Sequence, residues 1–289
     1  MQIDFHCHIF PGSSSMETLK SQFKNFRGYG FYERIIESVR NTESIETDDI
    51  IEKTLFHAKN AGLDKIVLLP LSIRQNDEIK KWYNAAPDKF IPFFNPPEKS
   101  TRAERVEELI KTALTSDIYK GLKIMVSFRK KRLNDEIIYP ACEVAEKLQV
   151  PTLFHTGYPP PGTKKQVLTY SNPLYLEELI ASFPKLKLII AHMGYPFVDI
   201  AISLAVQYPN VYLDISNLTY MMPNRLEKFL LRAKEIIGVE KILFGSDAFT
   251  PEMLEMTVNN FNTIESLGAK EKDRILGGNA RKILSSNLK

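Results

Sequence analysis

Four of the chain's five histidines stand where short apolar runs end, and with one aspartate they could bind a metal ion. His6 and His8 close the first run, and residues two apart on a strand project to the same face. His155 and His192 end two later runs, and Asp247 follows the last one. Three imidazoles and a carboxylate are donors that suit a divalent ion such as zinc, manganese or iron.

The elements that must position these residues alternate along the chain. Eight short β-branched runs are each followed by an amphipathic stretch, which predicts an α/β fold of the (β/α)8 TIM-barrel type in a single domain, 1–289. Because the C-terminal ends of barrel strands converge on one mouth, the four histidines and Asp247 should gather there. The expected strands are 2–6, 65–70, 90–95, 121–126, 152–155, 186–192, 211–215 and 241–245. The expected helices are 48–60, 76–86, 103–114, 135–148, 173–183, 197–207, 224–237 and 251–267, with a terminal helix within 271–284.

Each of these residues also has a plainer interpretation. Two histidines at a strand end could simply be satisfied by hydrogen bonds, and Asp247 alone could cap the helix that begins near Pro251. His57 lies in the middle of the first expected helix, so we expect it to be structural or at the surface. Asp214, Asn217 and Asn95 lie in the layer of the mouth, where they could support ligands, contact substrate or cap helices.

The segment 9–47, between the first strand and its helix, is too long for an ordinary barrel loop. We interpret it as a partly folded insertion over the barrel mouth that covers a substrate and excludes water. An aromatic cluster that packs only on itself is an equal alternative. Its aromatic residues include Phe10, Phe23, Phe26, Tyr29, Phe31 and Tyr32.

Composition favours a small-molecule enzyme over a binder of polymers. The 289 residues are 44% hydrophobic, enough for a large core, and 38 basic against 35 acidic residues give a net charge of only +3. This balance argues against nucleic-acid and membrane partners. Cys7 and Cys142 are the only cysteines, and the first strand leaves no room for a signal segment. We therefore expect a cytoplasmic protein without disulfides.

As an ordered set, the motifs resemble the amidohydrolase superfamily, and in particular the amidohydrolase-2 branch related to aminocarboxymuconate-semialdehyde decarboxylase. The resemblance spans essentially the whole chain. It rests on His6-x-His8, Gly121-Leu122-Lys123, His155, Ala191-His192-Met193-Gly194, Gly245-Ser246-Asp247 and Gly278-Asn279-Ala280.

The resemblance implies one divalent metal, with zinc favoured over manganese or iron, bound by His6, His8, His155 and Asp247. His192 would hydrogen-bond the attacking water or the substrate, and Asp247 would act as general base. A bound metal lowers the pKa of water toward ~7, which makes this chemistry feasible near neutral pH. Dimers are common among relatives, so a homodimer is one expected assembly.

Two further residues are candidates for binding an anionic substrate. Lys123, on the fourth strand, could neutralise a substrate carboxylate or pair with an acid. In some superfamily members a carboxylated lysine bridges two metals there, but the single-metal resemblance favours an unmodified Lys123. Arg74 follows the second strand, and its guanidinium could bind a carboxylate through two hydrogen bonds.

The leading hypothesis is a metal-dependent hydrolase acting on an ester, lactone or amide of a small organic acid. The alternative is a nonoxidative decarboxylase or hydratase of a conjugated carboxylic acid that uses the same site. A TatD-like nuclease would usually carry a glutamate where this chain has Lys123. A catalytically inactive binding barrel would usually have lost ligands, whereas all the expected ligand types are present here.

Overall fold

The computed structural model describes residues 1–9, 20–21, 24–43, 45–97, 103–158 and 167–285. Within them, eight strands run parallel in two sheets of order β1-β2-β3 and β4-β5-β6-β7-β8. Isolated parallel bridges join the sheets at both seams, Phe94 with Leu122 and Cys7 with Ala248. The strands are β1 (Ile3–Cys7), β2 (Lys65–Leu68), β3 (Phe90–Pro92), β4 (Leu122–Ile124), β5 (Thr152–Phe154), β6 (Leu188–Ile190), β7 (Val211–Asp214) and β8 (Ile242–Leu243).

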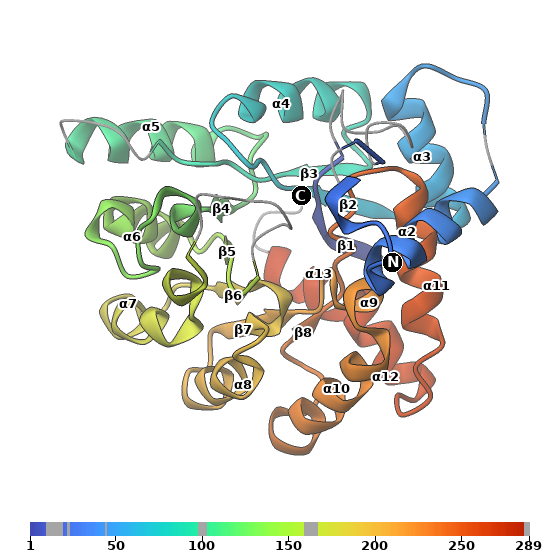
Figure 1. Cartoon of the computed structure of the whole chain (residues 1–289). Helices are drawn as coiled ribbons and strands as arrows, with labels where there is room; N and C mark the ends of the chain where they lie inside the picture. Colours follow the sequence, from blue (N-terminus) through green and yellow to red (C-terminus); the bar gives the residue numbers. More distant parts are fainter. Residues whose placement is uncertain (10–19, 22–23, 44, 98–102, 159–166, 286–289) are drawn as a thin grey trace.

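Helices surround these strands (Figure 1), so the predicted (β/α)8 TIM-barrel class is confirmed. Side-chain caps begin two of these elements: the Asp49 side chain accepts from two amides at the start of α3, and Asn172 precedes a proline-led turn. The helices that follow the strands are α3 (Ile50–Asn60), α4 (Gln75–Ala85), α5 (Ala103–Thr115), α6 (Tyr139–Leu148), α7 (Leu176–Ser182), α8 (Val198–Gln207), α10 (Pro223–Ile237) and α11 (Glu252–Asn262). The terminal segment forms α12 (Ala269–Asp273), a π-helical turn (Arg274–Gly278) and α13 (Asn279–Leu284).

The apolar core has two layers, because each strand is buried on both faces. One layer lies between strands and helices, and the other fills the barrel interior, where Ile3, Phe5, Val67 and Phe93 pack with Leu243. The interior layer also includes Ala280, Ile283 and Leu284 of α13. Because the interior is filled by side chains, a substrate can bind only at the ends of the strands, and in TIM barrels the C-terminal ends carry the active site.

Part of the 9–47 insertion is helical, which the sequence analysis did not predict. The helix α2 (Gly30–Asn41) packs against α11 and against the short helix α9 (Leu218–Met221), which follows β7. Arg34 of α2 donates to the carbonyl oxygens of Tyr220 at 2.8 Å and Met221 at 2.7 Å. The rings of Phe26, Tyr29 and Phe31 also contact one another. Phe10 and Phe23 lie outside the described residues.

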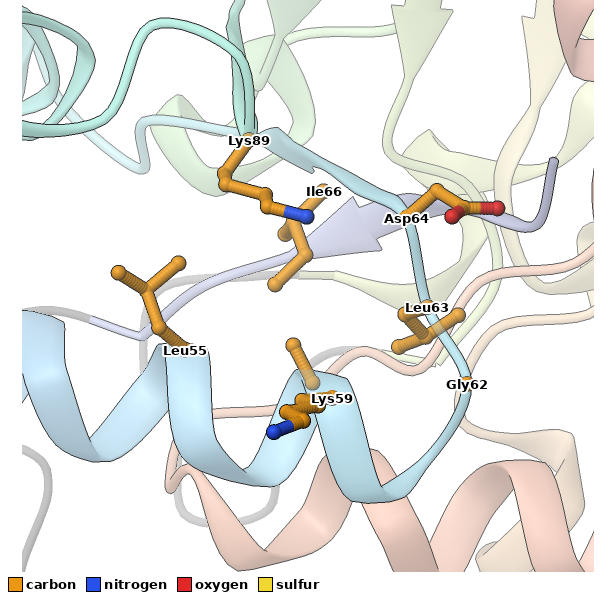
Figure 2. A pocket seen from close by; sticks show the side chains of 8 residues that line it. Leu55, Lys59, Gly62, Leu63, Asp64, Ile66 and Lys89 are labelled. Atoms are coloured by element: carbon orange, nitrogen blue, oxygen red, sulfur yellow. The ribbon is translucent and has the colours of Figure 1, made fainter.

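A cavity of about 370 Å³ lies at the N-terminal end of β2, opposite the barrel mouth (Figure 2). Leu55, Leu63 and Ile66 provide apolar lining, and Lys59 and Lys89 add positive charge. This end of a TIM barrel usually serves stability rather than catalysis. No helix among the described residues has the length and apolarity needed to cross a bilayer.

Candidate metal centre

An irregularity in β1 turns His6, and His8 directly after the strand, toward the barrel interior. Ile3 and Phe5 belong to the interior layer, whereas Cys7 packs in the outer layer, and the pairing register with β2 shifts between Asp4 and Cys7. In a regular strand Phe5 and Cys7 would share a face. The shift therefore places His6 and His8 on the side where Phe5 lies.

The buried carboxylate of Asp4 supports this irregular strand. Its Oδ1 accepts from the backbone amides of His6 at 3.0 Å and Ser246 at 2.8 Å. Burial raises the pKa of Asp4 to about 7, while hydrogen bonds from Ser246 and His6 oppose the shift. Asp4 thus links β1 to the segment after β8, the two parts of the chain that carry His6 and Asp247.

His6 and His8 direct their Nε2 atoms to a common point. These two atoms lie 3.0 Å apart, and Asp247 Oδ1 lies 3.6 Å from the first and 3.5 Å from the second. The Nδ1 of His8 lies 2.6 Å from the carbonyl oxygen of Leu69, which can only accept a hydrogen bond, so Nδ1 carries the ring proton. That contact leaves the lone pair of His8 on Nε2, free for a metal ion.

Asp247 is fixed by its backbone and by its side chain. It adopts a left-handed conformation with φ of 53°, and its amide donates to the carbonyl of His6 at 2.7 Å. The Tyr220 hydroxyl donates to Asp247 Oδ2 at 3.4 Å, on the side away from the histidines. Because Oδ2 is engaged in this way, Oδ1 faces the His6 and His8 imidazoles.

His155 and His192 join the same cluster from β5 and β6. The His192 ring lies 5.1 Å from that of His6 and 5.2 Å from that of His155, measured between centroids. His192 has a positive φ of 55°, in the 3-10 turn Ala191–Gly194 that follows β6. The structure therefore brings together all five residues predicted for the metal and the catalytic groups.

The arrangement fits a metal ion because one imidazole nitrogen lacks a partner. His155 Nε2 is buried and has no hydrogen-bond partner among the described residues. A buried nitrogen without a partner costs about 1–3 kcal/mol, which a metal–nitrogen bond would offset. His6, His8 and Asp247 also place one potential ligand atom each within 4.8 Å of one another.

The electrostatics of the cluster favour neutral imidazoles, the form that binds metals. Burial, followed by the charge of Lys123, holds the pKa of His6 and of His8 well below the usual range. Burial and the neighbouring His192 do the same for His155, and burial lowers the pKa of His192 to about 4. Burial also raises the pKa of Asp247 to about 7, against the opposing charge of Lys123.

The two predicted substrate-binding residues occupy different environments. Lys123 is fully buried, with Nζ 3.1 Å from His6 Nε2, and burial lowers its pKa to about 8. Arg74 is exposed at the start of α4, after the loop that follows β2. Lys123 therefore belongs to the centre of the cluster, whereas Arg74 is presented to solvent.

Sequence reasoning missed several residues that support the cluster. Asp4, Ser216 and Tyr220 were not singled out, Ser246 appeared only within the Gly245-Ser246-Asp247 motif, and Asp214 was not distinguished from a helix cap. The available signal for Asp4 was an acidic residue between the apolar Ile3 and Phe5 of the first strand. Nothing local to Ser216 or Tyr220 marks them, because their partners are distant in the chain.

A barrel mouth that gathers histidines and acids in this way defines a metal-dependent enzyme of the TIM-barrel class. The family model described as Amidohydrolase matches residues 3–285, so the chain belongs to this family and is an enzyme of the amidohydrolase superfamily. The resemblance inferred from the motifs is confirmed.

Individual relatives are more distant. Protein fluG of Emericella nidulans is 31% identical over 138 residues, which are 45% of this chain and only 16% of that protein. A Lactobacillus casei protein assigned to the metal-dependent hydrolases has a TM-score of 0.77 at 17% identity, with 100% of this chain and 96% of that chain covered. The 5-carboxyvanillate decarboxylase of Novosphingobium aromaticivorans, complexed with manganese and a nitrobenzoic acid, has a TM-score of 0.63 at 15% identity, covering 99% and 96%.

Proposed function

We propose that this protein is a metal-dependent hydrolase that cleaves an ester, lactone or amide of a small organic acid. The observation that carries the proposal is that His6, His8 and Asp247 place ligand atoms within 4.8 Å of one another. Beside them, the His155 ring contacts that of His192, and His155 Nε2 is buried and unpartnered among the described residues. His6, His8 and His155 would bind one divalent ion through Nε2, and Asp247 through Oδ1. Zinc is favoured for a donor set with three imidazoles, with manganese or iron as alternatives.

A bound ion would supply Lewis acidity to the scissile carbonyl and acidify a water molecule. The chain's own residues would handle protons and substrate. Asp247 accepts the proton of the attacking water, and Tyr220 holds the far oxygen of that carboxylate. His192 orients the reacting water by accepting a hydrogen bond at Nε2, since its Nδ1 donates to the carbonyl oxygen of Ser216.

The substrate would be anionic, because a buried ammonium group faces the cluster. Lys123 lies close enough to His6 to contact a substrate bound at the same ion, and its charge would pair with a carboxylate. Arg74 could add a second contact if the loop after β2 closes over the substrate. The buried, unpaired Cys7 and Cys142 support a cytoplasmic location.

The second candidate is a nonoxidative decarboxylase or hydratase of a conjugated carboxylic acid. It is favoured by a structural neighbour that holds manganese and an aromatic acid, and by the buried cation of Lys123. Decarboxylases and a hydratase recur among the solved structures with this fold. In this reaction Asp247 and His192 would deliver a proton to carbon.

Element analysis and a substrate panel test the proposal together. The zinc-loaded protein is incubated with esters, lactones, amides and conjugated acids, and acid production and carbon dioxide release are both recorded. The hydrolase proposal expects acid release that falls at least 100-fold in Asp247→Asn, a loss in the range of removed general bases. Carbon dioxide release without hydrolysis supports the lyase. A protein that takes up no zinc, manganese or iron refutes both.

A further inference from the structure

We propose that Asp214 is the positioning residue that fixes the tautomer of His6, so that His6 presents a lone pair on Nε2 to the metal ion. This inference rests on the proposed function and deepens it, since it explains why the cluster is ready to bind. It concerns a carboxylate outside the proposed ligand set, at the end of β7.

The two ring nitrogens of His6 have different neighbours. On the Nε2 side lie His8 and Asp247. On the Nδ1 side lies Asp214, with Oδ2 2.8 Å from Nδ1, and neither side chain is exposed. An ionised carboxylate can only accept a hydrogen bond, so Nδ1 must carry the proton.

The carboxylate of Asp214 is held in place by other donors. Its Oδ1 accepts from the amide of Ser216 at 2.8 Å and from the amide of His192 at 3.2 Å. The Ser216 hydroxyl also donates to the same oxygen. With three donors on Oδ1, only Oδ2 remains for His6, and the carboxylate cannot turn toward the ligand cluster.

The same contacts argue against a second metal on this side, although His6, His192 and Asp214 place potential ligand atoms close together. His192 Nδ1 lies 3.0 Å from the carbonyl oxygen of Ser216, an acceptor that requires a proton on that nitrogen. Protonated nitrogens cannot bind a metal. Asp214 therefore orients the ring of His6 and accepts from the backbone amide of His192, instead of binding an ion itself.

Replacing Asp214 with asparagine should reverse the tautomer of His6. Asparagine has one acceptor oxygen and one NH₂ group, and the three donors on the Oδ1 side require the oxygen there. Its NH₂ group would then face His6 Nδ1 and donate to it. The ring proton would move to Nε2, where it would displace the Lys123 ammonium group that lies 3.1 Å away and would block metal binding.

The test uses the full chain with nitrogen-15 in its histidines. The tautomer of His6 is read by NMR in metal-free protein, and the zinc affinity is measured by competition with a chelator. We expect the proton on Nδ1 in the wild type and on Nε2 in Asp214→Asn, with zinc binding weaker by about 10- to 100-fold. Ser216→Ala keeps the contact between His6 and Asp214, so it should keep the wild-type tautomer.

A matched control exists elsewhere in the barrel. His57 and Glu255 form a second histidine–carboxylate pair, at 2.7 Å between α3 and α11, and Glu255→Gln should leave zinc affinity unchanged. The inference is overturned if Asp214→Asn keeps the Nδ1 proton and wild-type zinc affinity, or if a wild type with two zinc ions loses one on this substitution. If the wild type binds no zinc, manganese or iron, the proposed function fails, whereas the NMR measurement still decides the role of Asp214. If Asp214→Asn does not fold, Ser216→Ala still tests the inference, because it keeps the contact between Asp214 and His6. A proton on Nε2 of His6 in that variant overturns the inference.

Discussion

Replacing Gly245 with alanine should weaken metal binding while leaving the barrel folded. Gly245 follows β8 and packs against β1, where an added Cβ would lie 2.6 Å from the Cβ of His6 and 3.0 Å from that of Ser216. The first of these distances is about 0.8 Å short of the 3.4 Å at which ordinary contact begins. His6 would have to shift by roughly that amount, more than the ~0.5 Å tolerance of a functional site.

The magnitude of both effects follows from this displacement. Overpacking of this kind costs about 1–3 kcal/mol of unfolding free energy, which lowers the melting temperature by roughly 2–10 °C. Zinc binding should weaken by about 10- to 100-fold, as when the support of a ligating histidine is lost. Chelator competition measures the affinity, and thermal melts of metal-free protein measure the stability.

Gly268→Ala is the matched control, because a Cβ at this exposed glycine would meet nothing nearer than 3.7 Å. It should retain wild-type zinc affinity. If Gly245→Ala instead binds zinc as tightly as the wild type, the close packing of β8 on His6 does not set the position of this ligand, and the reasoning is refuted.

Three other perturbations have expected results. Zinc at 100 times its Kd should stabilise the protein by about 2.7 kcal/mol, seen as a higher melting temperature that a chelator reverses; no rise would count against the site. Lys123→Met removes a buried charge 3.1 Å from His6 Nε2, so zinc affinity should rise about tenfold by titration while KM for an anionic substrate increases. A drop in zinc affinity would indicate a carboxylated, metal-binding Lys123. Glu255→Ala leaves the Nδ1 of the buried His57 without its hydrogen-bond partner, so the free energy of unfolding, measured with denaturant, should fall by about 1–3 kcal/mol. A smaller loss would mean that water replaces the carboxylate.

The barrel itself was predictable because its strands and helices carry strong local patterns. Each expected strand overlaps an observed one, and the histidines mark the strand ends that meet at the mouth. The helix α2 could also have been found, since Tyr32, Ile35, Ile36 and Val39 follow helical spacing. This helical period is visible only when 30–41 is considered apart from the rest of the insertion.

The detailed geometry of the cluster was not predictable from local patterns. In β1, a period of two groups Ile3, Phe5 and Cys7 on one face, yet the structure separates Cys7 from the other two. Both faces of a barrel strand are buried, so apolarity does not reveal the irregularity. The contact between His6 and Asp214 spans 208 positions, and only the closed fold brings these side chains together.

The seam between β1 and β8 has a consequence for how the protein is made. Cys7 and Ala248 meet across it although 241 positions separate them. A ribosome adds roughly 5–20 residues per second, so the segment with Ala248 is synthesised roughly 10–50 s after β1. During that interval the nascent chain exposes an unpaired strand edge beside His6 and His8, a surface on which chaperones would act before the site exists.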